Sequence, residues 1–438
     1  MRIPCRDRVV YRYFMLARRV TLLVPLAVFA ACAHPRAGGT PAGGVAPSET
    51  AEESCILSTG SVSGHTQTIT IGLSEAVDPR HAPFPRNDAE RLVFRHLYER
   101  PVRIDCDGHA RPELAGSWDK EDGGRRWTFR LRDDAQFWDG VPVSAQDVVF
   151  GRGGAGYTLS APESHVVAVT LAKAQDDVPP ALGDLGLAVT KPAPDSSWPI
   201  GTGAYWATSA TTTADEIRAH TSRGDTLVFK LAPPGSGGAR DLLDAGVDLL
   251  VTRDRALRDY AATLPNHSVV ALPWDRTYVY VTTDAGGTRF DGLEQSVRAE
   301  ARRAEGGFWW LDLKACGMGA QSAQASSPPA STGTKRILYP RSDPTARELA
   351  GRLAALTHAV ATGRAPDDFN DALAAGKDMG YVVALPRVTA DVCRAAKALL
   401  PSWPATFTAL LDTRATAIVR RGVARWVVDQ DGAVHLAP

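Results

Sequence analysis

The amino-acid sequence predicts an α/β protein with mixed sheets. Segments with apolar residues at every second position, which is typical of strands, alternate along the chain with segments whose apolar residues recur at helical spacing. In addition, about 380 residues follow the N-terminal leader and linker, which is more than one simple hydrophobic core usually holds. We therefore expect two lobes.

The first strand and the first helix of the globular part follow from local patterns. Ile69, Ile71 and Leu73 alternate with small or polar residues, which indicates a strand with one buried face. Asp88 is a suitable cap for a helix that runs to about Tyr98. Further strands are expected at 102–104, 247–251 and 277–283 and in 416–436, a further helix at 240–245, and both a strand and a helix within 337–360. Hairpin turns are expected at 107–108 and 431–432, and a glycine-rich turn at 199–205 leads into a possible strand.

One segment predicts a strand, a turn and a helix in succession. Trp127, Phe129 and Leu131 fall on one side of a strand, and the residues between them fall on the polar side. Ser144 can then cap a helix, because Asp147 stands at the third helical position, as in a capping box.

The first 32 residues are typical of an export signal. Six arginines precede an uncharged run at 20–31, which is too short to span a membrane. The run ends in Phe-Ala-Ala-Cys, which is similar to the lipobox of bacterial lipoproteins, where the cysteine is acylated. Cys32 is therefore the expected lipidation site. The alternative is an ordinary secretory signal in which Cys32 has no special role.

Residues 33–65 are expected to form a disordered tether. Pro, Gly, Ala, Ser, Thr and Glu make up most of 33–54, so this stretch has almost nothing to bury. A flexible linker of that length has an end-to-end distance of roughly 25 Å, which would hold the folded part clear of a lipid surface.

The charge balance gives no support for a nucleic-acid partner. Lys plus Arg and Asp plus Glu are equal at 49 each, so the chain has no overall electrostatic attraction for DNA, RNA or anionic lipid.

Four cysteines remain beyond Cys5 and the expected anchor, and four cysteines allow three pairings. Export to an oxidising compartment favours disulfides. We favour Cys55 with Cys106 and Cys316 with Cys393, because each pair falls within one expected lobe. Free buried thiols are the alternative. The spacings match no zinc site, and we expect no metal.

Three consecutive segments closely resemble the signature of extracellular solute-binding proteins of family 5. They are Arg-Pro-Glu-Leu-Ala-Gly-Ser-Trp at 111–118, Trp-Thr-Phe-Arg-Leu-Arg-Asp-Asp-Ala-Gln-Phe-Trp-Asp-Gly at 127–140 and Val-Pro-Val-Ser-Ala-Gln-Asp-Val-Val-Phe at 141–150. Weaker similarities follow in the family's order at 199–205, 243–248 and 296–299. Members of this family deliver peptides, nickel, haem or certain sugars to ABC transporters.

The resemblance implies a two-lobed, periplasmic binding protein-like fold of type II, with an interlobe cleft that closes on a ligand. Lobe I would comprise 66–283 together with 405–438, and lobe II would comprise 284–404, with a flexible loop at 317–334. The partners implied are a small solute or oligopeptide, the permease of an ABC importer and, through the lipid anchor, a membrane. The expected location is the periplasmic side of the cell membrane. The outer membrane is the alternative, because Ala33 and not Asp follows the anchor cysteine.

Two departures from the family pattern open a second interpretation. Only 151–162 separates the signature helix from the next strand, where family members carry a few dozen residues, and no stretch corresponds to the acidic anchor for a peptide's amino terminus. Asp378 is the nearest candidate for that anchor. The alternative function is a degenerate relative that has lost the pocket and serves a structural or interaction role.

The candidate ligand-binding residues come from the resemblance and from aromatic content. Arg80 and His81 lie in the loop after the first strand, and Tyr278 lies near the proposed crossover between lobes. Trp309 and Trp310 are candidates to line the cleft, because aromatic faces bind peptide and apolar groups, and the favoured alternative is packing in the core of lobe II.

We expect no catalytic residue, no cofactor and no enzymatic activity. The glycines at 151–156 match the letters of a dinucleotide-binding fingerprint, but they follow a helix where that motif requires a strand. The histidines are scattered, and no nucleophile has a recognisable base beside it.

Overall fold

The structure is a computed structural model that describes nine stretches of the chain: 55–57, 68–150, 156–194, 197–232, 238–282, 290–303, 308–310, 335–387 and 405–437. All of them belong to one compact unit, 44–438. The expected leader, Cys32, Cys316, Cys393, the glycines at 151–155 and the loop at 317–334 lie outside these stretches. Within the described stretches, no helix has the length and apolar character needed to cross a membrane.

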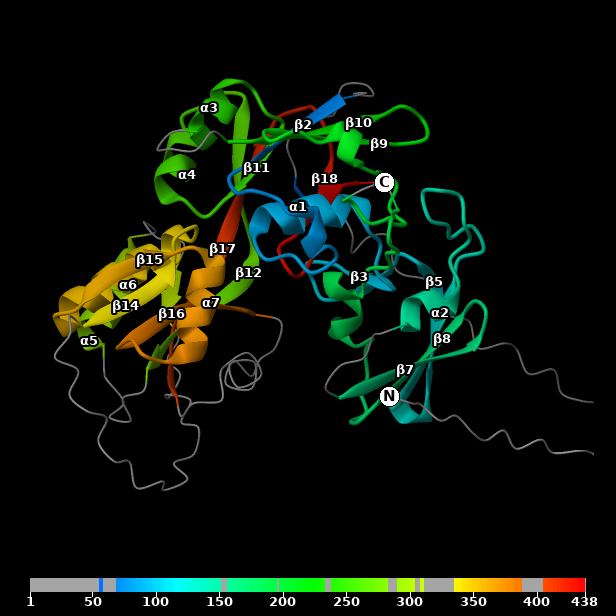
Figure 1. Cartoon of the computed structure of the whole chain (residues 1–438), viewed down its shortest axis with the longest axis horizontal. Helices are drawn as coiled ribbons and strands as arrows, with labels where there is room; N and C mark the ends of the chain where they lie inside the picture. The colour runs from blue at the N-terminus through cyan, green and yellow to red at the C-terminus, as the bar shows by residue number, and fades with distance from the viewer. Residues whose placement is uncertain are drawn as a thin grey trace, which may run out of the picture. The chain divides into compact units, whose positions relative to one another are not determined.

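A ten-stranded mixed sheet forms the centre of the fold (Figure 1). Its strands in spatial order are β15 (Val360–Arg364), β14 (Arg336–Pro340), β16 (Gly380–Pro386), β12 (His267–Thr282), β17 (Thr406–Arg420), β11 (Leu249–Thr252), β2 (Thr68–Leu73), β10 (Thr226–Leu231) and β9 (Glu216–His220), and β13 (Phe308–Trp310) pairs with β17. β10, β2 and β11 are parallel, and so are β15, β14 and β16. The predicted α/β class with mixed sheets is therefore confirmed.

The long antiparallel strands β12 and β17 connect the two parallel halves of this sheet. They pair from His267 opposite Arg420 to Thr282 opposite Thr406. At one end β11 pairs with β17, and at the other end β16 pairs with β12. We call β12 and β17 the crossover strands.

Both crossover strands are longer than the sequence predicts. A strand was expected at 277–283 and another from 416 onward, whereas β12 begins at His267 and β17 begins at Thr406. The middle of β12 is irregular, with register shifts between Ala271 and Arg276, and it contains charged residues that break the apolar alternation. Local periodicity therefore identified only parts of each strand.

The helices are α1 (Asp88–Leu97), α2 (Ala145–Val149), α3 (Gly238–Asp244), α4 (Arg255–Ala261), α5 (Asp291–Arg302), α6 (Pro344–Thr357) and α7 (Pro366–Ala375), with short 3-10 turns at Pro79–His81, Asp122–Gly124, Pro180–Gly183, Leu185–Leu187 and Ser209–Thr211. The prediction that Asp88 caps α1 is wrong. The cap is Asn87, whose side chain accepts a hydrogen bond from the Glu90 N–H at 2.8 Å. Asp88 is the first residue of the helix, and its carboxylate is free to bind arginines.

The family-like segment forms a separate four-stranded antiparallel sheet, in the order β5 (Ala115–Glu121), β6 (Arg126–Leu131), β8 (Val166–Leu171) and β7 (Tyr157–Glu163). Trp127, Phe129 and Leu131 are buried in one hydrophobic cluster, as predicted. Thr128, expected on the polar side, is buried too, because its hydroxyl donates to Glu121 at 2.7 Å. Helix α2 has the predicted capping box with Ser144.

The possible strand after the turn at 199–205 does not form, since only an isolated bridge joins Trp206 to His220. The glycines of this turn instead allow close contact with the end of α1. A Cβ on Gly201 would lie 2.4 Å from the Leu97 carbonyl oxygen, and one on Gly203 would lie 2.7 Å from the same atom. The segment therefore serves packing against α1.

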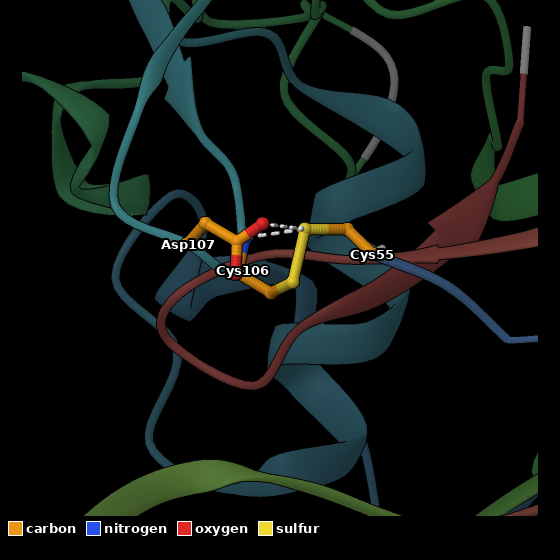
Figure 2. Close-up of side chains that lie close together, drawn as sticks. All are labelled: Cys55, Cys106 and Asp107. Carbon is orange, nitrogen blue, oxygen red and sulfur yellow. Dashed lines mark hydrogen bonds between the residues drawn. A yellow bond between two sulfur atoms is a disulfide. The ribbon is translucent and has the colours of Figure 1, made fainter. Parts of the chain in front are cut away.

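A disulfide joins Cys55 to Cys106 and ties the N-terminal strand to the first hairpin (Figure 2). The strand β1 (Ile56–Leu57) pairs with β18 (Trp426–Val428), which pairs with β19 (Val434–Leu436). The hairpin is β3 (Val102–Ile104) with β4 (Ala110–Pro112), and its Asp107-Gly108 turn is as predicted. Both sulfurs and the Asp107 carboxylate lie within ligand distance of one another. Because the sulfurs are bonded to each other, this group is a structural link.

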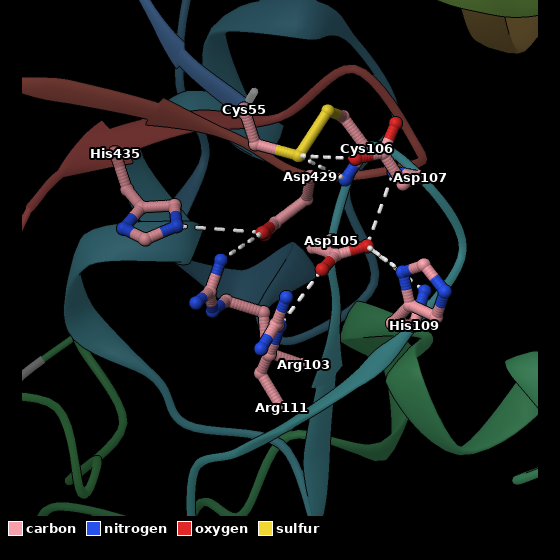
Figure 3. Close-up of a disulfide and its surroundings, with 9 residues drawn as sticks. All are labelled: Cys55, Arg103, Asp105, Cys106, Asp107, His109, Arg111, Asp429 and His435. Carbon is pink, nitrogen blue, oxygen red and sulfur yellow. Dashed lines mark hydrogen bonds and ion pairs between the residues drawn. A yellow bond between two sulfur atoms is a disulfide. The ribbon is translucent and has the colours of Figure 1, made fainter. Parts of the chain in front are cut away.

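Buried ion pairs surround the disulfide (Figure 3). Asp105 pairs with Arg111 at 2.7 Å, and Asp429 lies 2.7 Å from Arg95 and 2.8 Å from Arg100. Burial alone would raise the pKa of Asp429, but the two guanidinium groups outweigh it and hold this pKa well below the usual value. Asp429 therefore stays ionised and fixes the C-terminal hairpin against α1.

Candidate ligand-binding site

Three chain segments that leave the carboxyl ends of parallel strands meet beside the crossover strands. Glu75 follows β2, Arg253 follows β11, and Asp343 follows β14. The first two strands belong to one half of the sheet and the third to the other half. Carboxyl ends of parallel strands are where ligands bind in α/β proteins.

Charged side chains from these segments contact one another. The Nε of Arg253 lies 2.7 Å from the Asp88 carboxylate, and its Nη1 lies 3.1 Å from Asp275 on β12. Arg276, also on β12, donates to the other oxygen of Asp88. Two arginines therefore share one carboxylate at the start of α1.

Two residues of β12 also contact Asp343, which follows β14 in the other half of the sheet. Tyr278, on β12, donates its hydroxyl to Asp343 at 2.7 Å, and an Arg276 nitrogen lies 3.6 Å from Asp343. Asp343 also caps α6, because it accepts from the Ala346 N–H at 2.9 Å. We call these residues the Asp88 network: Glu75, Asp88, Arg253, Asp275, Arg276, Tyr278 and Asp343.

The acids of the Asp88 network titrate very differently. Burial, followed by the negative charge of Asp88, raises the pKa of Glu75 to about 7. Burial also acts to raise the pKa of Asp88, but the charges of Arg253 and Arg276 hold it far below its usual value. The Asp88 N–H donates to Glu75 at 3.2 Å, so the two carboxyls are neighbours. Glu75 is therefore the acid of this pair that changes charge near neutral pH.

A cavity of about 1000 Å³ opens next to the Asp88 network, and we call it the large cavity. It is bounded by α4, both crossover strands, the end of α5 and the first turn of α6. Its lining residues are Arg253, Asp254, Arg255, Ala256, Arg258, Asp259, Val269, Ala271, Trp274, Ala301, Pro344, Thr345, Arg347, Glu348, Thr413, Arg414 and Thr416. It is large enough for a small peptide or a molecule of similar size.

A second cavity of about 240 Å³ is lined by Asp275, the neighbour of Trp274, and by Phe84, Arg91 and Arg387 among others. The loop after β2 borders this small cavity. It is held by Glu90, whose carboxylate accepts from the Arg86 N–H at 2.7 Å.

The predicted contact residues lie in several different places. Arg80 is exposed and pairs with Asp78, and His81 lies 2.7 Å from Glu90, so both belong to the loop after β2 without lining either cavity. Tyr278 is fully buried and reaches the site only through Asp343.

The remaining predicted residues come from the second half of the sheet. Asp378 pairs with Arg336 at 2.7 Å. Both residues lie at the amino ends of β16 and β14, whereas the large cavity lies beyond the carboxyl end of β14. The backbones of Trp309 and Trp310 pair with Asp412 and Leu411 of β17. Their side chains lie outside what the structure describes.

Sequence reasoning missed the residues that form the large cavity, among them Arg253, Trp274, Arg347 and Arg414. One usable signal was present. The expected strand at 247–251 is followed directly by Thr-Arg-Asp-Arg, and polar residues at the carboxyl end of a buried strand indicate a site. The short helix α4 that begins there was not predicted.

Residues 109–217 match the family model described as bacterial extracellular solute-binding proteins, family 5 Middle. The periplasmic oligopeptide-binding protein OppA of Escherichia coli is 48% identical over 61 residues, which cover 14% of this chain and 11% of that relative. This part of the chain is therefore similar to the family 5 solute-binding proteins. The resemblance found in the sequence is therefore confirmed. The match spans only about a tenth of the relative's length.

Solved structures extend the likeness from this segment to the fold of the chain. The murein tripeptide binding protein MppA of Escherichia coli matches 86% of this chain and 100% of its own, with a TM-score of 0.61 and 14% identity. NikZ of Campylobacter jejuni, solved with Ni(L-His), matches 84% of this chain and 97% of its own, with a TM-score of 0.59 and 14% identity. The predicted two-lobed fold of type II is thereby confirmed.

Proposed function

We propose that this protein binds a small solute or peptide-like molecule in the large cavity and presents it to the permease of an ABC importer. One observation carries the proposal: the cavity is lined by the segment after β11 from one half of the sheet and by the start of α6 from the other half. A ligand that touches both halves stabilises the arrangement in which they are close together.

The division into lobes follows from the same idea. Lobe I would comprise 66–283 with 405–438, and lobe II would comprise 284–404, so that the crossover strands act as the hinge. Closure of two lobes about such a hinge excludes water and strengthens polar contacts with the solute. The Asp88 network, which contains Asp88 of lobe I and Asp343 of lobe II, would be the contact that adjusts on closure.

We further propose that Cys32 carries a lipid, that the residues between Cys32 and Cys55 form the tether and that the protein faces the periplasm. The tether expected at 33–65 is too long, because Cys55 is disulfide-bonded and Ile56–Leu57 form a paired strand. Its relatives in the family are binding proteins, and we propose no catalytic activity here. Trp309 and Trp310 remain proposed solute contacts, and the buried Tyr278 acts by positioning Asp343. Arg80, His81 and Asp378, which were also expected to contact the solute, lie away from the lining of the large cavity.

A thermal-shift screen tests the transport function. The purified protein without its leader is heated with di- to hexapeptides, nickel complexes and haem, each at about 100 times a plausible dissociation constant. A bound solute at that ratio adds about 2.7 kcal/mol of stability, which raises the melting temperature by a few degrees. A well-folded protein that no compound stabilises would contradict the proposal.

The second candidate is a degenerate family member with a structural role. The observation that favours it is that the arginines of the Asp88 network are already neutralised by the protein's own carboxylates. The same screen distinguishes the two functions, because a solute-independent lipoprotein would be stabilised by none of the compounds. Measuring which membrane holds the protein adds a second test, since an importer's receptor needs access to its permease.

A further inference from the structure

We propose that the large cavity binds an anionic solute, a small molecule with at least two carboxylate or phosphate groups, through Arg347, Arg414 and Thr413. The proposal rests on the proposed solute-binding function and specifies the class of solute. Five arginines line the cavity, against three acidic residues. Arg253 is neutralised by Asp88 and Asp275, and Arg255 and Arg258 both lie beside Asp259. The positive charge that attracts anions and disfavours bare metal cations therefore comes from Arg347 and Arg414.

The three acidic residues of the lining are already occupied by partners within the protein. Asp259 pairs with Arg258 at 2.8 Å, and Glu348 pairs with Arg352, which is not part of the lining. Asp254 accepts from the Ala256 N–H at 2.8 Å and caps α4. These three acids therefore do little to neutralise Arg347 and Arg414.

Two of the arginines have no such partner. Across the part of the chain that the structure describes, Arg347 in the first turn of α6 and Arg414 on β17 form no ion pair with an acidic residue. The guanidinium of Arg414 lies 4.7 Å from the centre of the Trp274 ring, which positions it by a cation-π contact. A fixed guanidinium can donate two parallel hydrogen bonds to a carboxylate or phosphate.

A buried hydroxyl supplies an independent observation. Thr413 precedes Arg414 on β17 and is only 3% exposed, and its hydroxyl has no hydrogen-bond partner among the described residues. Buried polar groups are normally hydrogen-bonded, so an unsatisfied hydroxyl in a cavity wall indicates a position for a ligand atom. An acid oxygen held by Arg414 would be a suitable acceptor for it.

Helix α6 places Arg347 in the cavity wall. It has 14 residues, and its first turn, which includes Thr345 and Arg347, forms part of that wall. The Asp343 carboxylate already caps the amino terminus of this helix, so the positive charge of the wall comes from the Arg347 side chain. The two arginines and the hydroxyl thus favour negative charge in the same space.

The test is a titration calorimetry comparison with the soluble full-length mature chain, in which Cys32 is replaced by Ser. The probes are citrate, inorganic phosphate, the dipeptide Glu-Glu and the dipeptide Gln-Gln, which has the same size without acidic side chains. The variants are Arg414→Gln, Arg347→Gln and Thr413→Val. Arg421→Gln serves as the control, because it removes the same charge from an exposed position outside the cavity.

The expected result is that citrate or Glu-Glu binds more tightly than Gln-Gln. Arg414→Gln and Arg347→Gln should each raise the dissociation constant about tenfold or more, as expected for a hydrogen-bonded ion pair, while Arg421→Gln leaves it within twofold. An increase in salt from about 50 mM to 500 mM should also weaken binding, because ions screen exposed charges.

Two outcomes would overturn the anionic assignment. Equal binding of Glu-Glu and Gln-Gln, unchanged by Arg414→Gln, would mean that solute binding holds but the class is wrong. Binding of neutral peptides or nickel complexes with no binding of any acidic probe would mean the same. Failure of every compound, here and in the thermal-shift screen, would instead remove the proposed function itself. Melting temperatures of all variants within about 2 °C of the parent exclude misfolding as the cause.

Discussion

Arg253 and Asp88 form an ion pair with an Nε to Oδ2 distance of 2.7 Å, although they are 165 residues apart in the sequence. The pair connects the start of α1 to the segment after β11. Arg276 from β12 binds the same carboxylate, so Asp88 is shared by two largely buried guanidinium groups, whose other acidic neighbours are Asp275 and Asp343.

Asp88→Asn should therefore be strongly destabilising. Loss of one partner from a buried ion pair leaves uncompensated charge and costs about 3–5 kcal/mol. Urea denaturation at pH 7 measures this difference. The control is Asp78→Asn, because Asp78 pairs with the exposed Arg80, and such surface pairs contribute about 1 kcal/mol or less. Equal stability of the two variants would show that the Asp88 network does not hold the fold together.

The raised pKa of Glu75 leads us to predict an unusual dependence of folding stability on pH. Its pKa is about 7 in the folded protein and 4.5 for an unperturbed glutamate, so between these values the folded form keeps a proton that the unfolded form has lost. The contribution of Glu75 to stability is fully present below pH 4.5 and is lost as the pH rises through 7. Glu75→Gln should remove this loss and stabilise the protein at pH 8 by about 1–3 kcal/mol.

Unfolding free energies of Glu75→Gln and the parent at pH 5 and pH 8 check this prediction. Glu163→Gln is the control, since Glu163 is exposed on β7 and should give no difference between the two pH values. A Glu75→Gln variant that is less stable than the parent at pH 8 would mean that the ionised carboxylate is favourable in the folded state.

For His96 we predict the opposite dependence: its contribution to folding stability decreases as the pH falls. Burial lowers the pKa of this α1 histidine to about 3, whereas the unfolded value is near 6.5, so the unfolded chain takes up a proton first as the pH falls. The stability that depends on neutral His96 is present above pH 6.5 and is lost progressively toward pH 3. His96→Gln should reduce the loss between pH 7 and 4.5 by about 2 kcal/mol. His109→Gln, at an exposed turn, should not change that loss.

The disulfide between Cys55 and Cys106 should stabilise the protein mainly through the unfolded chain. The bridge closes a loop with a sequence separation of 51, for which the chain-entropy relation gives about 4 kcal/mol. The double variant Cys55→Ala with Cys106→Ala should unfold at a correspondingly lower urea concentration. A dithiothreitol-treated parent should be at least as destabilised as the double variant, because the expected Cys316–Cys393 bridge would be reduced as well. Identical unfolding of the oxidised and reduced parent would contradict the stabilising role.

Local patterns in the sequence were sufficient for the elements whose residues interact with near neighbours. The strand at Trp127, Phe129 and Leu131 and the capping box at Ser144 depend on spacings of two and three residues, which are visible in one sequence. The cap of α1 was misassigned by one position because Asn87 and Asp88 are both good caps, and only the structure shows which one turns toward the Glu90 N–H.

The site could not be predicted in the same way, because its residues come together from distant segments. Arg253, Arg347 and Arg414 line one cavity only after α4, α6 and β17 have packed beside one another. Arg253 directly follows a predicted buried strand, but neither Arg347 nor Arg414 is unusual in its local sequence. The resemblance to family 5 predicted the fold, but this chain's own arginines distinguish its cavity.

Filling the large cavity with a bulky side chain tests whether solute binds there. Ala271 of β12 lines the cavity and is solvent-exposed, so Ala271→Trp should occupy the space without disturbing the core. The measurement is the dissociation constant, by titration calorimetry, of the tightest solute found in the screens. We predict an increase of at least tenfold for Ala271→Trp at an unchanged melting temperature, and no change for Lys230→Trp on an exposed position of β10. An unchanged dissociation constant in the folded Ala271→Trp variant would contradict solute binding in this cavity.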